Sequence, residues 1–217
     1  ELTSKQLSTY YADKAPVPTN AKELFRLMRH GGGLDREFNN PLYKEKLANI
    51  PLETIRGWVE ELCQSGQITK VNGTGQEELD GKWFVPYMAE IHGTLGCLAV
   101  AGGKDVENLL ELHTAGLTYS IATAFDGTKP TAWEERSLGD PQEALRVKII
   151  EMLGSEGPKT SDEMVERLPF PQTLIERALH ELEGRNVISV GFFIQTDDAE
   201  YILKIDEHRL TGGEEEV

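Results

Sequence analysis

The side chains best placed for chemistry are cations and hydroxyls at the starts and on the outer faces of predicted helices, and they suit contact with nucleic acid. Near the C-terminus, Lys159 and Thr160 precede a helix start, where a cation and free backbone N–H groups favour phosphate. On the following helix, Thr173, Arg177 and His180 lie opposite the apolar residues. Because such side chains can reach phosphates or base edges, these five residues form one predicted contact surface.

A second predicted contact surface lies in the first third of the chain. Its members carry a positive charge or a hydrogen-bonding group outside the apolar stripes, and they are Arg26, Arg29, Lys44, Lys46, Thr54, Arg56, Lys70 and Asn72. Residues 1–50 hold eight basic and six acidic side chains, a net charge of +2, whereas every later stretch of about fifty residues is negative. If one surface contacts phosphate, we expect it to be this one.

Other kinds of chemistry lack the residues that they need. Gly102–Gly103–Lys104 follows an apolar run, but Leu98 and Asp105 stand where a phosphate-binding loop has its first glycine and its Ser or Thr. The five histidines and two cysteines have no metal-ligand spacing, and no Gly-x-Ser-x-Gly motif is present. No pair of carboxylates stands out among the many. We therefore predict no catalytic residue, no metal and no cofactor.

The C-terminal surface would be positioned by a unit that spans residues 140–210. Apolar residues repeat at helical spacing up to Gly154, and Gly157–Pro158 ends that helix. Thr160, with Glu163 three residues later, starts a second helix, and a third ends at Gly184. Two β-rich runs follow, at residues 187–194 and 201–205. This order of helices and strands is typical of a winged helix, an elaborated helix-turn-helix.

The same order is predicted for residues 21–86, which makes the chain an α+β, mostly helical protein with tandem winged helix-turn-helix domains. Three helices are expected at residues 21–30, from Pro41 and from Pro51, followed by strands at 68–71 and 82–86. Residues 1–20 are expected to be an irregular lead-in with one helical turn. Residues 87–139 are predicted to be a mixed connector or a partial third unit, with helices at 87–95 and 106–113 and a strand at 117–125. Residues 211–217 form an acidic tail.

The C-terminal unit resembles the winged-helix modules that follow the motor of large helicase-related (Lhr-like) ATP-dependent helicases, especially archaeal ones. The matching features are Gly157–Pro158 with Thr160, the run Ala178–Leu179 with Glu181–Leu182, the segment Gly191–Phe192–Phe193, and Glu200–Tyr201–Ile202–Leu203–Lys204 before Asp206 and Leu210. The stretch from Trp83 to Gly96 is similar to a Trp-containing segment of that family. The chain has neither the phosphate-binding motif nor the DExH motif of the motor. The resemblance therefore implies an accessory region without ATPase activity.

The bulk composition restricts the partners. The net charge is −15, and residues 151–217, with six basic and sixteen acidic side chains, contribute −10 of it. Such acidity opposes non-specific binding to nucleic acid, so any contact requires a local basic surface. No apolar run approaches the roughly 18 residues of a membrane span. Together with only two cysteines, this favours a cytoplasmic protein without membrane contact.

Three functions remain open at this point. The first is a non-catalytic accessory region of an Lhr-like helicase that contacts DNA or braces the helicase motor. The second is a tandem winged-helix adaptor between proteins in a chromosome or transcription complex, which the acidic C-terminal part favours because an acidic surface suits a basic partner. The third is a winged-helix transcription regulator. We favour the first of these.

Overall fold

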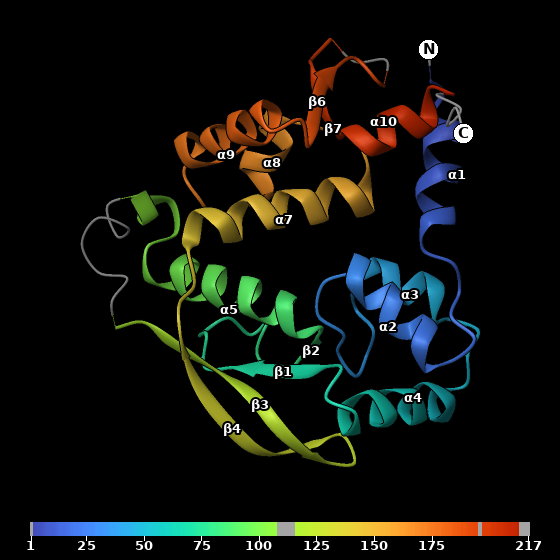
Figure 1. Ribbon diagram of the computed structural model, residues 1–217, viewed down its shortest axis with the longest axis vertical. Helices are drawn as coiled ribbons and strands as arrows, with labels where there is room; N and C mark the ends of the chain where they lie inside the picture. Colours follow the sequence, from blue (N-terminus) through green and yellow to red (C-terminus); the bar gives the residue numbers. More distant parts are fainter. Residues whose placement is uncertain (1, 108–115, 195–196, 213–217) are drawn as a thin grey trace.

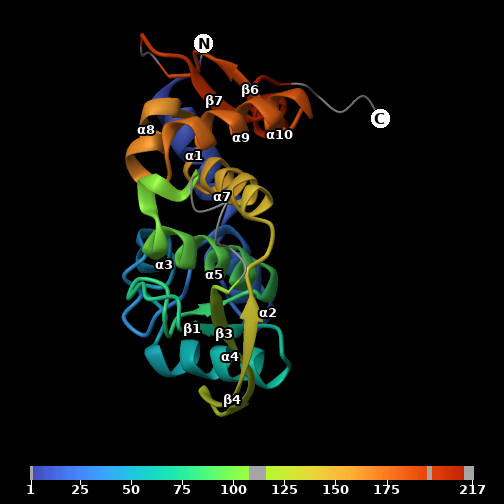
Figure 2. The same cartoon turned by 90° about the vertical axis from the view of Figure 1, so that its left-hand side faces the viewer.

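The computed structural model describes residues 2–107, 116–194 and 197–212 and has an α+β fold. Its elements form a stack of layers, and the molecule is elongated along the direction of stacking (Figure 2). A C-terminal group of helices and a small sheet lies at one end, helices α7 and α5 lie in the middle, and a second sheet with α4 lies at the other end (Figure 1).

The first group consists of α2 (Ala21–His30), α3 (Pro41–Lys46), α4 (Leu52–Gln64), β1 (Thr69–Asn72) and β2 (Trp83–Phe84). Asn20 caps α2 by accepting a hydrogen bond from the N–H of Glu23, and Pro41 and Pro51 fix the starts of the next two helices. β2 pairs with β1, and Leu34 forms an isolated bridge to Trp83. The apolar faces of the three helices meet in one core that includes Leu24, Tyr43 and Ile55.

The middle of the chain extends the first sheet. Helix α5 (Pro86–Ala101) is followed by a short 3-10 turn (Gly103–Asp105) and by the long hairpin of β3 (Thr118–Asp126) and β4 (Lys129–Ser137). Because Val71 pairs with Ile121, the strand order is β2-β1-β3-β4, and this sheet crosses the expected boundary at residues 86–87. The predicted helix at 106–113 lies largely outside the described residues. β4 was not predicted, because its first two residues, Lys129–Pro130, have the composition of a turn.

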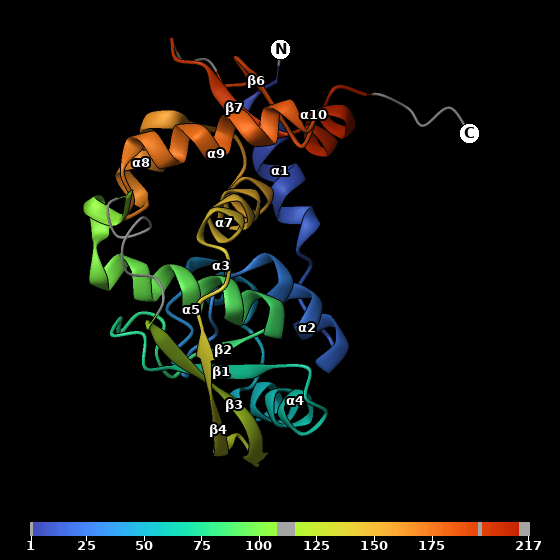
Figure 3. The same cartoon turned by 60° about the vertical axis from the view of Figure 1, so that its left-hand side comes forward.

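The last group consists of α7 (Pro141–Glu156), β5 (Lys159–Thr160), α8 (Ser161–Arg167), α9 (Gln172–Gly184), β6 (Ile188–Gly191), β7 (Glu200–Leu203) and α10 (Lys204–Leu210). Its strands pair in the order β5-β7-β6. Helix α7 lies between α5 and α9, as its end-on view in Figure 3 shows. One apolar cluster, with Leu98, Ile149 and Leu179 among its members, runs through all three helices. The middle and last groups therefore share a core.

Two predictions about the ends of the chain were wrong. Residues 1–20 are not an irregular lead-in, because Ser4–Lys14 form helix α1, which begins with a capping box between Thr3 and Gln6. The β-rich run expected to reach Ile205 ends at Leu203, where helix α10 begins. Both helices are held by Asp206, which is fully buried and accepts hydrogen bonds from Tyr10 (2.6 Å) and Lys14 (3.0 Å).

Candidate nucleic-acid interface

A groove runs along α4. Its lining residues come from this helix, the loop after α2, Trp83 and the turn that joins β3 to β4, and Figure 1 shows where these elements lie. Its lining residues are Arg36, Phe38, Leu52, Ile55, Arg56, Val59, Glu60, Trp83, Gly127 and Thr128. The groove has a volume of about 990 Å³, open solvent included. Two exposed arginines therefore stand beside a largely apolar floor.

The hairpin turn is fastened to the C-terminal end of α4. The side-chain amide of Gln64 donates to the carbonyl oxygens of Phe125 (3.3 Å) and Gly127 (3.1 Å). Thr69 adds a hydrogen bond from its hydroxyl to the carbonyl of Ala122 (2.6 Å) on the neighbouring strand. These bonds hold the turn as one wall of the groove.

Lys70 lies inside the protein and not on the predicted contact surface. Only 8% of it is exposed, and its ammonium lies 4.3 Å from the ring centroid of Trp83. Burial lowers the pKa of Lys70, and the nearby charge of Arg36 lowers it further. The neighbouring Cys63 is also buried, which raises the pKa of its thiol to about 11 and leaves it protonated. Lys70 therefore supports the floor of the groove and does not reach solvent.

The remaining N-terminal candidates do not gather at one place. Arg56 and Thr54 are exposed on α4, and Asn72 is exposed at the end of β1. Lys44 is exposed on α3, but the ammonium of Lys46 donates to the carbonyl of Ala12 (3.0 Å) and so fastens the end of α1.

Arg26 and Arg29 belong to a separate hollow at the other side of the first group. They line it together with Lys14 and His30. The guanidinium of Arg29 lies 5.3 Å from the ring centroid of Phe25. Burial lowers the pKa of His30, and the charges of Lys14 and Arg29 act in the same direction. Since a cation in the last turn of a helix stabilises its dipole, a structural role suffices for Arg29.

The C-terminal candidates are engaged with carboxylates or with the helix ends. The hydroxyl of Thr173 donates to Glu107 (3.0 Å), which also pairs with Arg177 (3.5 Å). Lys159 lies 3.7 Å from Glu156 and 3.9 Å from Glu163. Thr160 caps α8 by accepting from the N–H of Glu163. His180 is exposed on α9. This surface is therefore neutralised before any phosphate approaches.

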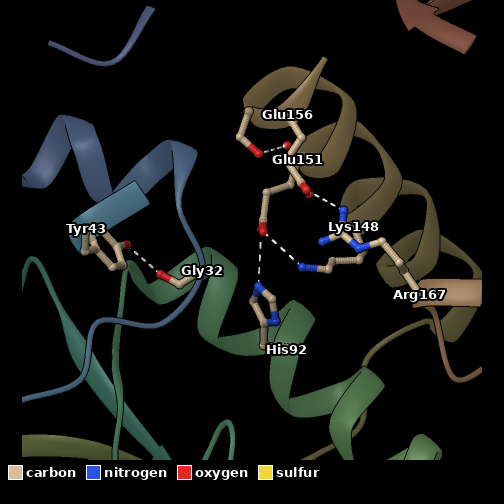
Figure 4. A network of polar contacts seen from close by, with 8 residues as sticks. Gly32, Tyr43, His92, Lys148, Glu151, Glu156 and Arg167 are labelled. Atoms are coloured by element: carbon tan, nitrogen blue, oxygen red, sulfur yellow. Dashed lines mark hydrogen bonds and ion pairs between the residues drawn. The ribbon is translucent and has the colours of Figure 1, made fainter. Parts of the chain in front are cut away.

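A buried polar cluster joins α5 to α7 (Figure 4), and none of its members lines the groove along α4. His92 on α5 lies 3.2 Å from a carboxylate oxygen of Glu151 on α7, and Lys148 lies 3.1 Å from the other oxygen. Burial lowers the pKa of His92 more than the carboxylate raises it. Burial alone would raise the pKa of Glu151, but the hydrogen bond with His92 and the charge of Lys148 keep it below its ordinary value. The cluster thus consists of a neutral imidazole and an ion pair.

The glycine-rich turn at 102–104 has a structural role. Lys104 donates three hydrogen bonds, to the carbonyl oxygens of Val165 (2.9 Å), Leu168 (3.0 Å) and Phe170 (2.8 Å). Its charge therefore neutralises the C-terminal end of α8. Among the described residues, no group of three or more His, Cys, Asp or Glu side chains could hold a metal ion. In the same part of the chain, no helix combines the length and apolar character needed to cross a membrane.

Sequence reasoning missed most of the groove. Arg36 and Phe38 lie in a loop, and Gly127 and Thr128 lie about seventy residues after α4 begins. Of the groove residues, only Arg56 belongs to the predicted contact surfaces, and the tendency of Asp126–Gly127 to form a turn was also visible in the sequence. The place of this turn beside α4 depends on the pairing of β1 with β3.

Comparison of the chain with models of protein families gives no match, and comparison with curated proteins gives none either.

Proposed function

We propose that the chain is a non-catalytic tandem winged-helix region that contacts nucleic acid through the groove along α4. The order of elements supports the winged-helix assignment of both units. Each has a helix, a short β-segment, two helices and two strands, and in each the first β-segment pairs with the last strand, through Leu34–Trp83 in one unit and β5–β7 in the other. In this assignment α4 and α9 occupy the position of the recognition helix.

The observation that carries the proposal is the state of the cations around α4. Within the described residues, neither Arg36 nor Arg56 forms an ion pair, although both are exposed at the groove. Lys129, which directly follows the turn that forms the far wall of the groove, is also exposed. Exposed cations without carboxylate partners can neutralise phosphates and release counterions, which is the main source of non-specific affinity. On α9, by contrast, Arg177 already has a carboxylate partner.

The larger protein to which such a region would belong is suggested by the resemblance of residues 140–210 to Lhr-like helicases. In that setting the N-terminal unit contacts DNA, and the acidic C-terminal unit braces the motor. This division of roles agrees with the net charges of +2 over residues 1–50 and −10 over residues 151–217.

A titration of the full chain against labelled single-stranded, duplex and forked DNA at about 50 and 200 mM salt tests the proposal. We expect binding at the lower salt that weakens steeply at the higher one. The double variant Arg36→Glu with Arg56→Glu should lose at least tenfold in affinity. The matched control, Arg177→Glu with Arg185→Glu, makes the same change in net charge on and beyond α9 and should have a much smaller effect. Absence of binding at 50 mM salt, or equal losses in the two variants, would overturn the proposal.

Assembly with another protein is the second candidate, and it is favoured by the free edge of the C-terminal sheet. The order β5-β7-β6 leaves β6 at the edge, with Val190 44% exposed and the following Phe192 69% exposed. Exposed apolar residues on and beside an edge strand suit pairing with a partner strand. The net charge of −10 over residues 151–217 favours a basic partner. A lysine-rich β-forming peptide is the probe. Under this candidate it binds the wild type and not Phe192→Glu, while DNA does not bind.

A further inference from the structure

The floor of the groove along α4 is more apolar than contact with a duplex backbone requires. Ile55, Val59 and Trp83 form it, and each is at least 95% buried. Leu52 stands at the rim with 44% of its surface exposed. Phosphates and sugars are recognised by polar and charged groups. An apolar floor beside cations instead suits the face of an unstacked base, whose stacking on aromatic and apolar side chains contributes to binding.

Phe38 enters the groove from a backbone conformation that aromatic residues rarely adopt. Its φ angle is 53°, in the left-handed region that favours glycine. The surrounding turn is fixed by Asp35, which accepts from the backbone N–H (3.0 Å) and the side-chain amide (2.9 Å) of Asn39. Non-glycine residues held in this region cluster at ligand sites, where the rest of the structure maintains the strain. The turn therefore presents an aromatic ring to the groove at some cost in stability.

The charged groups at the rim fit the other parts of a nucleotide. Arg36 follows Asp35 in the fixed turn, and Arg56 comes from the opposite wall on α4, so a strand that crosses the groove passes both guanidinium groups. Glu60 also lines the groove. A carboxylate repels phosphate, but it accepts hydrogen bonds from the amino group of a base.

Duplex DNA meets obstacles at the same place. Glu53, Glu60 and Glu61 are exposed on α4, and they oppose the entry of this helix between two phosphate backbones. The turn at Gly127–Thr128 also stands beside the helix and narrows the approach to its outer face. A single strand is narrower and needs only one line of cations.

We propose that the groove along α4 binds an unstacked base of single-stranded nucleic acid, which stacks on Phe38 above the apolar floor while its flanking phosphates contact Arg36 and Arg56. This inference rests on the proposed function and adds the class of nucleic acid that the groove selects.

Binding of the full chain to three 12-residue probes tests the inference. These are an oligothymidylate, an abasic deoxyribose-phosphate oligomer of the same length and charge, and a duplex. At about 50 mM salt we expect the oligothymidylate to bind about tenfold more tightly than the abasic oligomer, as the stacking of one to two bases implies. The duplex should also bind more weakly. Phe38→Ala should remove this preference, Phe38→Tyr should keep it, and Phe192→Ala is the control for loss of an exposed aromatic ring.

The outcomes separate the two proposals. Equal affinity for the oligothymidylate and the abasic oligomer, or an unchanged preference in Phe38→Ala, would overturn base stacking and leave phosphate contact in place. Failure of every probe to bind would overturn the proposed function itself. The thermal midpoint of each variant identifies loss of folding, and in that case Phe38→Leu, which keeps an apolar side chain without a ring, gives the decisive comparison.

Discussion

The N-terminal unit (residues 21–86) and the C-terminal unit (residues 140–210) of this protein differ in how their cations are paired. In the C-terminal unit, Arg146, Lys148, Lys159, Arg167 and Arg177 all have carboxylate partners. Between residues 21 and 85, which the structure describes in full, no lysine or arginine takes part in an ion pair with a described residue. Some of the carboxylates there bind neutral groups instead, as Glu23 binds Thr19 and Asp80 binds Thr74.

This difference shows that a count of charges along the chain underestimates the contrast between the units. A paired cation stabilises its own fold, whereas an exposed cation without a partner remains available to an anion from outside. The C-terminal unit should therefore respond to charge changes through its stability and the N-terminal unit through its binding. Four predictions test this distinction.

The largest effect is expected at the buried carboxylate that joins α1 to α10. Asp206→Ala removes the carboxylate that accepts hydrogen bonds from Tyr10, Tyr11 and Lys14. The ammonium of Lys14, which also donates to the carbonyl of Gly154, is mostly buried and loses its ion-pair partner. The loss should be about 3 kcal/mol in the free energy of unfolding, measured with urea. Glu166→Ala on the exposed side of α8 is the control and should change it by less than about 0.5 kcal/mol. Similar losses in the two variants would contradict the role of the buried carboxylate.

A matched pair of arginine substitutions compares the units directly. Arg146 joins α7 to α9 through Glu181 (2.5 Å) and also pairs with Glu143 (2.7 Å) on its own helix, so Arg146→Ala should destabilise the protein by about 2 kcal/mol. Arg56→Ala removes an exposed side chain without an ion pair to a described residue and should cost less than about 0.5 kcal/mol. For DNA affinity the order should reverse, so that Arg56→Ala weakens binding more than Arg146→Ala does. Equal losses of stability would end the distinction between the units.

A smaller effect should follow acidification, because two buried histidines have lowered pKa values. Burial keeps His92 and His30 neutral in the folded protein, whereas the unfolded chain takes up protons below about pH 6.5. Stability is therefore present above that pH and falls as the pH decreases through it. His92→Gln should reduce the slope of unfolding free energy between pH 8 and 5.5, and the double variant with His30→Gln should reduce it further.

The smallest effect is expected for the surface pair of Arg167 and Glu156. Both side chains are more than one third exposed, and such pairs contribute about 0.2–1 kcal/mol. Arg167→Ala should therefore lower the unfolding free energy by no more than this amount, and the difference should vanish in about 1 M salt. A loss that persists in high salt would mean that Arg167 acts through packing.

Local signals predicted much of the secondary structure. The helix expected at residues 21–30 is present with Asn20 as its cap, because the cap and the apolar spacing both act within a few residues. The break at Gly157–Pro158 is also correct, since the C-cap Gly157 has a φ of 91° that other residues avoid. Helix α10 was missed because Leu203 and Ile205 continue an apolar run, although Asp206 fixes that segment as a helix by contacts with the other end of the chain.

The groove could not be predicted either, because it also depends on contacts between segments that are far apart in sequence. Lys70 seemed exposed because strands usually alternate between a buried and an open face, but β1 is covered on both faces, by α5 and by the core that contains Trp83. Arg36 gained importance only because Phe38 adopts a left-handed backbone conformation and because a distant hairpin lies beside α4. Both conditions depend on contacts between segments that are far apart in sequence.

The contact between Tyr10 and Asp206 joins residues 196 positions apart. Closing so long a loop has a high entropic cost that is recovered only when both ends meet. During synthesis, α1 is made long before the carboxylate of Asp206 that it contacts. Helix α1 must therefore wait, without its polar partner, while the layers between α4 and α9 assemble. Docking of α1 becomes a late step of folding and, in the finished protein, one of the first contacts to open.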